Sequence, residues 1–93
     1  MTTLEKAKKL KELYLNGDEV VRLMQFIGYE FDKRGFTSIR AERTPSVRVR
    51  KDGLIKDFGS GWSGDIFDLL QEYHSMSFKE AVEYIQKALN VNF

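Results

Sequence analysis

Hydrophobic residues recur at helical spacing near both ends of the 93-residue chain and at strand spacing in its middle. Between residues 4 and 15 the apolar positions lie three or four residues apart, and Thr2 with Glu5 has the form of a capping box. This pattern predicts a helix over 4–15. Asp18 is expected to cap a second helix that ends near Ile27.

The middle of the chain alternates apolar and polar residues with a period of two. The segment 46–50 places two valines on one side, facing a core, and Arg48 and Arg50 together on the other side. The Asp-Gly step at 52–53 predicts a tight hairpin turn, and residues 54–58 predict the return strand.

Residues 36–40 are a further candidate strand, and two helices are predicted to close the chain. The first covers about 65–73, and the second begins at Ser77, where Ser77 and Glu80 repeat the capping-box pattern. The predicted fold class is therefore α+β: a small antiparallel sheet with a β-hairpin, flanked by two N-terminal and two C-terminal helices. We expect an extra helix over 1–17 and the main body of this single domain over 18–93.

Composition restricts the classes of function. The chain has no cysteine and one histidine, which removes disulfides, thiolate nucleophiles and Cys-based zinc sites. We therefore expect no metal and no cofactor. There is no run of 18 apolar residues and no signal peptide, so a cytoplasmic protein without a membrane span is predicted.

No pair of nucleophile and base stands out, so the chain is not expected to be an enzyme on its own. His74 is expected at the surface, because a single histidine after a helix has no second ligand beside it. Asp65, Asp68 and Glu72 share part of a helix surface and are expected to form a solvated acidic face rather than a metal site.

The net charge of +1 hides a strong segregation of charge along the chain. Residues 33–56 carry a net charge of +6, whereas residues 1–32 carry −1 and residues 57–93 carry −4. A local basic field suits a polyanion, and guanidinium groups bind phosphates and stack on bases. The alternative, a sheet face that is merely solvated, stays open at this point.

The loop at 57–65 contains three glycines with the spacing G-x-G-x-x-G, namely Gly59, Gly61 and Gly64. A dinucleotide site would also need a second, parallel strand, and none is predicted here. We therefore expect a tight loop whose glycines adopt positive φ. Trp62 in this loop is either a packing lid or an exposed stacking platform, and the sequence leaves both open.

Two short motifs resemble those of a known family. Residues 42–46 read Glu-Arg-Thr-Pro-Ser, residues 57–61 read Asp-Phe-Gly-Ser-Gly, and Gly64-Asp65 opens a helix. In order and spacing, residues 18–92 resemble the zinc-binding domain of DnaG-type bacterial and phage primases. That family has Cys-Pro-x-His-x-Glu-Lys-Thr-Pro-Ser, a hairpin, and Cys-Phe-Gly-Cys-Gly. The resemblance implies a zinc-ribbon-like fold.

The metal positions depart from the family pattern. By the resemblance, they fall on Thr37, Arg40, Asp57 and Ser60, none of which is Cys or His. The resemblance thus implies a relative that has lost zinc. Our hypothesis is that an Arg40–Asp57 ion pair, with Thr37 and Ser60 hydrogen-bonding nearby, supplies the stability that a structural zinc otherwise gives.

In the primase family this domain binds single-stranded template and helps a polymerising domain to start a primer, sometimes in trans. The resemblance therefore implies a small non-catalytic subunit that contacts single-stranded DNA and works with a separate polymerase or primase of a phage, plasmid or other mobile element. The candidates for template contact are Arg43, Arg48, Arg50, Lys51 and Lys56, with Trp62 for stacking. The alternative is a protein-interaction module whose helices at 4–15 and 77–89 dock a partner without DNA.

Overall fold

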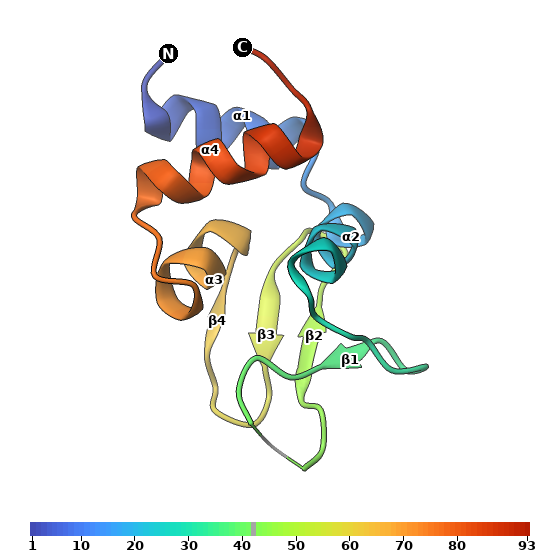
Figure 1. Cartoon of the computed structure of the whole chain (residues 1–93). Coiled ribbons are helices and arrows are strands. Elements are labelled where there is room, and N and C mark those ends of the chain that lie inside the picture. The colour runs from blue at the N-terminus through green and yellow to red at the C-terminus, as the bar shows by residue number, and fades with distance from the viewer. Residues whose placement is uncertain (42) are drawn as a thin grey trace.

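The computed structural model describes residues 1–41 and 43–93, which form four helices and one antiparallel sheet. The elements are α1 (Thr3–Leu13), α2 (Gly17–Ile27), β1 (Phe36–Thr37), β2 (Val47–Val49), β3 (Ile55–Asp57), β4 (Ser63–Gly64), α3 (Ile66–Tyr73) and α4 (Phe78–Leu89). The strands lie in the order β1-β2-β3-β4 (Figure 1). This arrangement confirms the predicted α+β class.

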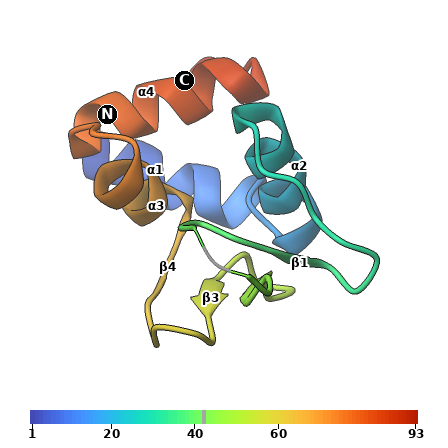
Figure 2. The same ribbon diagram turned by 60° about the horizontal axis from the view of Figure 1, so that its bottom comes forward.

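The helices gather at one end of the molecule and the strands at the other (Figures 1 and 2). α1 and α4 pack side by side, and α3 contacts both α4 and β4. The fully buried core takes residues from all of these layers, among them Leu10, Met24, Ile55, Phe67 and Ile85. Within the described residues, no helix has the length and apolar character that crossing a bilayer requires.

The predicted capping boxes at α1 and α4 are both present. At α1, the Glu5 backbone N–H donates to the Thr2 hydroxyl, and the Glu5 carboxylate accepts from the Thr2 N–H. The equivalent pair of bonds joins Ser77 and Glu80 at α4. These bonds satisfy backbone donors that have no partner inside the helix, and so they fix where each helix begins.

The start of α2 differs from the prediction. Asn16, not Asp18, is the cap, and its side-chain oxygen accepts from the N–H of Glu19 over 2.9 Å. α2 therefore begins at Gly17, and α1 ends at Leu13 rather than at residue 15. Gly17 lies against the hairpin, where its N–H donates to the carbonyl of Lys51 over 2.8 Å. A side chain at Gly17 would collide with the hairpin backbone, so the packing selects a glycine there.

The β2–β3 hairpin has the predicted faces. Arg48 pairs with Lys56 across the two strands, and both side chains are exposed. Val47 and Ile55 are fully buried on the opposite face. The turn closes with Gly53 at φ +91°, a conformation that glycine adopts without strain.

Two strands differ from the prediction. β1 ends at Thr37 instead of residue 40, because the chain turns away and brings the side chain of Arg40 to Asp57. β4 lies in a segment that the sequence predicts as loop, because the two residues Ser63–Gly64 are too few to show an alternating pattern. Of the three loop glycines, Gly61 alone has positive φ.

Candidate nucleic-acid interface

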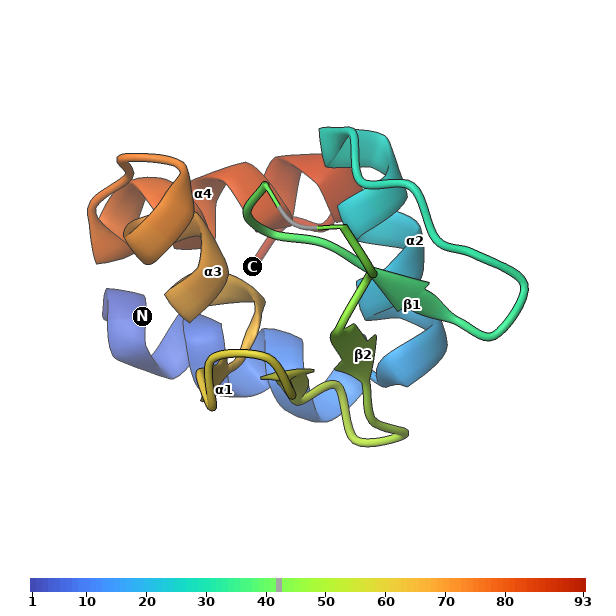
Figure 3. The ribbon, with the colours of Figure 1, turned by 90° about the horizontal axis from the view of Figure 1, so that it is seen from below.

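One face of the sheet points away from the helices (Figure 3). Cationic and aromatic side chains gather on this face. We call it the open face and define it by Phe36, Arg48, Arg50, Lys56 and Phe58. The strand register explains the grouping, because Phe36 pairs with Arg48 and Arg48 pairs with Lys56. Residues paired across antiparallel strands project to the same side of the sheet.

The open face carries two phenylalanine rings, Phe36 and Phe58. Their centroids are 6.4 Å apart, and Phe58 is 61% exposed. The Lys56 ammonium lies 5.4 Å from the Phe58 centroid, and the Arg48 and Arg34 guanidiniums lie 5.5 and 5.1 Å from the Phe36 centroid. Such distances are those of cation–π contacts, which hold the cations beside the rings.

Phe36, Phe58 and Arg34 also contribute side chains to this cationic and aromatic surface, and the sequence did not predict them there. A signal was present, because strand alternation places Phe36 and Phe58 on the same face as Arg48 once the register is known. The register of the short β1 could not be read from its two residues.

Most of the predicted cations come together beside these rings. A shallow hollow of about 280 Å³ is lined by Arg48, Val49, Arg50, Lys51, Lys56 and Phe58. Arg50 has a carboxylate partner, since its Nη2 lies 2.8 Å from Asp52 Oδ2. Both side chains of this pair are about 60% exposed, so the pair is weak and a phosphate can compete for the guanidinium. Arg43 is exposed in the loop before β2 and does not line the hollow.

Trp62 does not lie on the open face. Its carbonyl accepts from the Asp57 N–H over 2.8 Å, so Trp62 is paired with the last residue of β3, whose side chain is buried. Its ring packs edge-on against Tyr73 of α3 at 5.6 Å and borders the core. The sequence left two alternatives open for Trp62, a packing residue and an exposed stacking platform. Its contacts in the structure are those of a packing residue.

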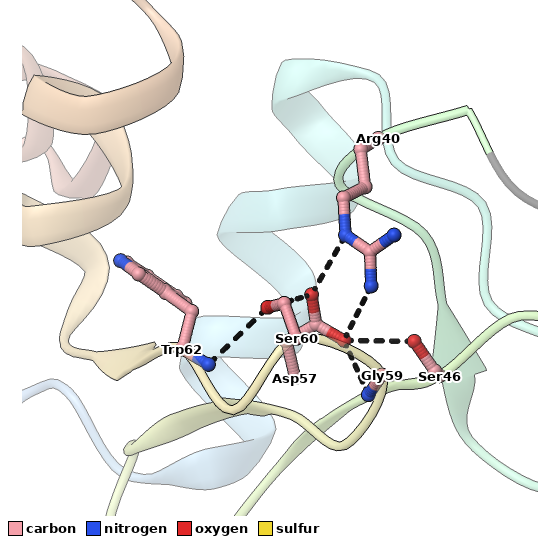
Figure 4. A network of polar contacts seen from close by, with 6 residues as sticks. All are labelled: Arg40, Ser46, Asp57, Gly59, Ser60 and Trp62. Atoms are coloured by element: carbon pink, nitrogen blue, oxygen red, sulfur yellow. Dashed lines mark hydrogen bonds and ion pairs between the residues drawn. The ribbon is translucent and has the colours of Figure 1, made fainter.

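A polar cluster lies behind the open face, centred on a fully buried carboxylate (Figure 4). We call it the Asp57 cluster: Arg40, Ser46, Asp57, Gly59 and Ser60. Asp57 Oδ1 accepts from the Ser46 hydroxyl at 2.8 Å and the Gly59 N–H at 2.9 Å. Asp57 Oδ2 accepts from the Ser60 hydroxyl at 2.7 Å and from Arg40 Nε at 3.1 Å.

These bonds determine the protonation state of Asp57. Burial alone raises the pKa of a carboxyl group, but the donors Ser60, Ser46, Gly59 and Arg40 outweigh it and hold the pKa of Asp57 well below its usual range. Asp57 is therefore ionised at neutral pH, and the predicted Arg40–Asp57 ion pair is present.

Thr37 is the exception among the four family metal positions. The sequence predicts it near the ion pair, but its buried hydroxyl donates to the carbonyl of Glu30 over 2.6 Å. Thr37 therefore ties β1 to the preceding segment of chain instead of joining the Asp57 cluster.

The residues at these positions do not fit a zinc ion. Zinc in structural sites takes thiolate and imidazole ligands, and this chain has no cysteine. The single carboxylate, Asp57, already accepts hydrogen bonds from four residues, one of them the cationic Arg40. In the part of the chain that the structure describes, no three His, Cys, Asp or Glu residues are grouped to hold a metal.

The acidic residues near α3 serve the helix itself. Asp65 caps α3 in a reciprocal pair of hydrogen bonds with Asp68, and Lys11 of α1 lies 3.0 Å from Asp65. His74, expected at the surface, is half-buried and lies 2.7 Å from the Tyr29 hydroxyl. The two residues are 45 positions apart, so no local pattern could reveal this contact.

The α+β fold, with two loops that meet at Asp57, is typical of a small zinc-ribbon-like domain. Residues 16–93 match the family model of the CHC2 zinc finger, so the chain belongs to that family. A DNA primase from Clostridium acetobutylicum is 30% identical over 89 residues, which are 95% of this chain and 14% of that primase. No solved structure matches the chain. The family resemblance inferred from the motifs is thus confirmed. Glu42, the first residue of the motif at 42–46, lies outside the residues that the structure describes.

Proposed function

We propose that this chain is a primase-related DNA-binding accessory that holds single-stranded template on the open face of its sheet. Membership of the CHC2 zinc-finger family supports a primase-related role. The observation on which the proposal rests is the combination of exposed cations with two aromatic rings on one face, of which Phe58 is largely exposed and Phe36 half-buried. We assign primer synthesis itself to a separate polymerase or primase, which this chain assists in trans.

The cations supply the contacts to phosphate. Arg48 and Lys56 are cross-strand neighbours, and Arg50 and Lys51 border the same hollow. Their side chains are exposed, so neutralising a phosphate requires little desolvation of other groups. Arg43 extends the positive field into the adjacent loop. Each phosphate contact releases condensed counterions, which makes the affinity fall with salt.

The aromatic rings supply the preference for a single strand. Bases in a duplex are stacked on each other and hidden, whereas unpaired bases can stack on exposed side-chain rings. Phe58 is the most exposed ring of the open face, with Phe36 beside it. Trp62 acts here by packing the β3–β4 turn that positions Phe58, and its fluorescence is a reporter of binding.

Fluorescence anisotropy of a labelled oligothymidine tests this proposal. The wild-type chain is expected to bind the single strand more tightly than the matching duplex. Arg48→Glu and Lys56→Glu should each weaken binding about tenfold, while Lys79→Glu on the distant α4 should not. Equal affinities for single strand and duplex, or equal effects of all three reversals, would overturn the proposal.

The alternative function, a protein-interaction module, would have to dock its partner on the apolar side chains of α1 and α4 that stay exposed. The apolar stripes of α1 and α4 pack against each other and bury residues such as Leu10 and Ile85. Leu4 and Leu13 of α1 remain exposed and are the candidate docking positions. If Arg48→Glu leaves stimulation of a primase intact while Leu13→Asp abolishes it, docking is the function and template binding is not.

A further inference from the structure

We propose that the Asp57 cluster takes the structural place of the zinc ion of its family, so that this domain folds without metal. The proposal is independent of whether the open face binds DNA. It concerns Asp57, which is buried on the side of β3 opposite to Lys56 and Phe58 of the open face.

The topology of the cluster is that of a cross-link between two loops. Arg40 and Ser46 belong to the loop between β1 and β2, and Gly59 and Ser60 belong to the turn between β3 and β4. All four donate to the same carboxylate. By the family resemblance, a zinc ion would join the same two segments, with one ligand pair from each.

The hydrogen bonds of the buried carboxylate are also all satisfied within the cluster. Asp57 is fully buried, and each of its oxygens has at least two donors. A Cβ atom at Gly59 would lie 2.5 Å from Arg40 Nη2 and 2.8 Å from Ser46 Oγ, so a side chain there would displace two donors of the cluster. The loop therefore lies close to the donors that surround the carboxylate.

The charges of the cluster exclude a cation. The guanidinium of Arg40 supplies the positive charge that balances Asp57. A zinc ion would have to displace it and would then find two hydroxyls in place of thiolates. Removing the guanidinium of Arg40 is costly, because it leaves the negative charge of Asp57 buried without its counter-charge.

Thermal unfolding of the full chain tests this proposal. A zinc chelator and added zinc should both leave the melting temperature of the wild type unchanged. Asp57→Ala should lower it by roughly 10–30 °C, because it removes the acceptor of all four donors, and Arg40→Met by roughly 5–15 °C, because the carboxylate keeps its three other donors. Arg43→Met, an exposed arginine of the same loop, is the matched control. A chelator-sensitive wild type, or an Arg40→Met variant that melts with the control, would overturn the proposal.

A variant that places metal ligands in the cluster gives a second test, which does not depend on whether Asp57→Ala folds. The quadruple variant Arg40→His, Ser46→Cys, Asp57→Cys, Ser60→Cys changes side chains that already meet at one point, and it should bind Co²⁺ with the absorption bands of tetrahedral thiolate ligation. Its melting temperature should fall when a chelator is added. Failure to bind Co²⁺ would show that the cluster does not occupy a metal position.

Discussion

Phe36 and Arg48 face each other across β1 and β2, with the Arg48 guanidinium 5.5 Å from the centroid of the Phe36 ring. The contact holds a long, flexible cation beside an aromatic ring before any ligand arrives. Ordering a side chain on binding costs free energy, so a side chain that is already placed gives tighter binding for the same contacts. The same reasoning applies to Lys56 over Phe58.

Replacing Phe58 by leucine should weaken single-strand binding without unfolding the domain. The ring is largely exposed, and loss of one base-stacking contact costs about 1–3 kcal/mol. Phe26→Leu on α2 is the matched control, because that ring is even more exposed but lies away from the open face. Equal affinities of the two variants in an anisotropy titration would remove Phe58 from the interface.

The salt dependence of binding should report how many phosphate groups the protein contacts. On single strands each contact contributes about −0.7 to the slope of log K against log salt. Arg48→Met combined with Lys56→Met should therefore make the slope less steep by about 1.4. Isothermal titrations at four salt concentrations measure this slope. A slope unchanged by the double substitution would mean that these two side chains do not touch phosphate.

Acid should destabilise the fold through Asp57. The pKa of this carboxyl is lower in the folded state than in the unfolded chain, so the folded state binds fewer protons. The resulting stability is present above about pH 4 and is lost progressively as the pH falls below it. The capping residues Glu5 and Glu80 also have lowered pKa values, so Asp57→Asn is needed to isolate the effect.

The melting temperature of the wild type should accordingly fall more steeply between about pH 4 and pH 2 than that of Asp57→Asn. Both proteins share the capping carboxylates, so the difference between the two curves belongs to residue 57. Parallel curves would contradict the assignment of an ionised Asp57 in the fold.

The two turn glycines Gly53 and Gly35 should differ in their tolerance of alanine. Both have positive φ, which costs an alanine about 1–2 kcal/mol. A Cβ atom at Gly53 would also collide with the carbonyl of Leu15, whereas at Gly35 it meets open space. Urea denaturation should therefore show a larger loss of unfolding free energy for Gly53→Ala. A larger loss at Gly35 would contradict the described docking of the hairpin on the α1–α2 junction.

Elements with a local signal were predictable from the sequence. The capping boxes at Thr2 and Ser77 and the alternation around Arg48 each lie within a few residues, and the structure has all three. The motifs at 42–46 and 57–61 gave the family, and with it the meeting of Arg40 and Asp57.

The remainder depends on contacts between distant segments. Asn16 caps α2 because Gly17 has to lie against Lys51, and nothing near Asn16 in the sequence reports that contact. The pairing of Phe36 with Arg48 requires the register of a two-residue strand. For the same reason the aromatic half of the open face was not predicted, although its basic half was.

The account depends most on the open face of the sheet being where a nucleic acid lies. Titration of the ¹⁵N-labelled chain with a short oligothymidine, followed by backbone amide NMR, tests this directly. The account predicts shifts that concentrate on β1, on β2 and β3 around Arg48 and Lys56, and on Phe58, with α1 and α4 unaffected. Shifts confined to α1 and α4, or no shifts with the oligonucleotide in large molar excess, would contradict it.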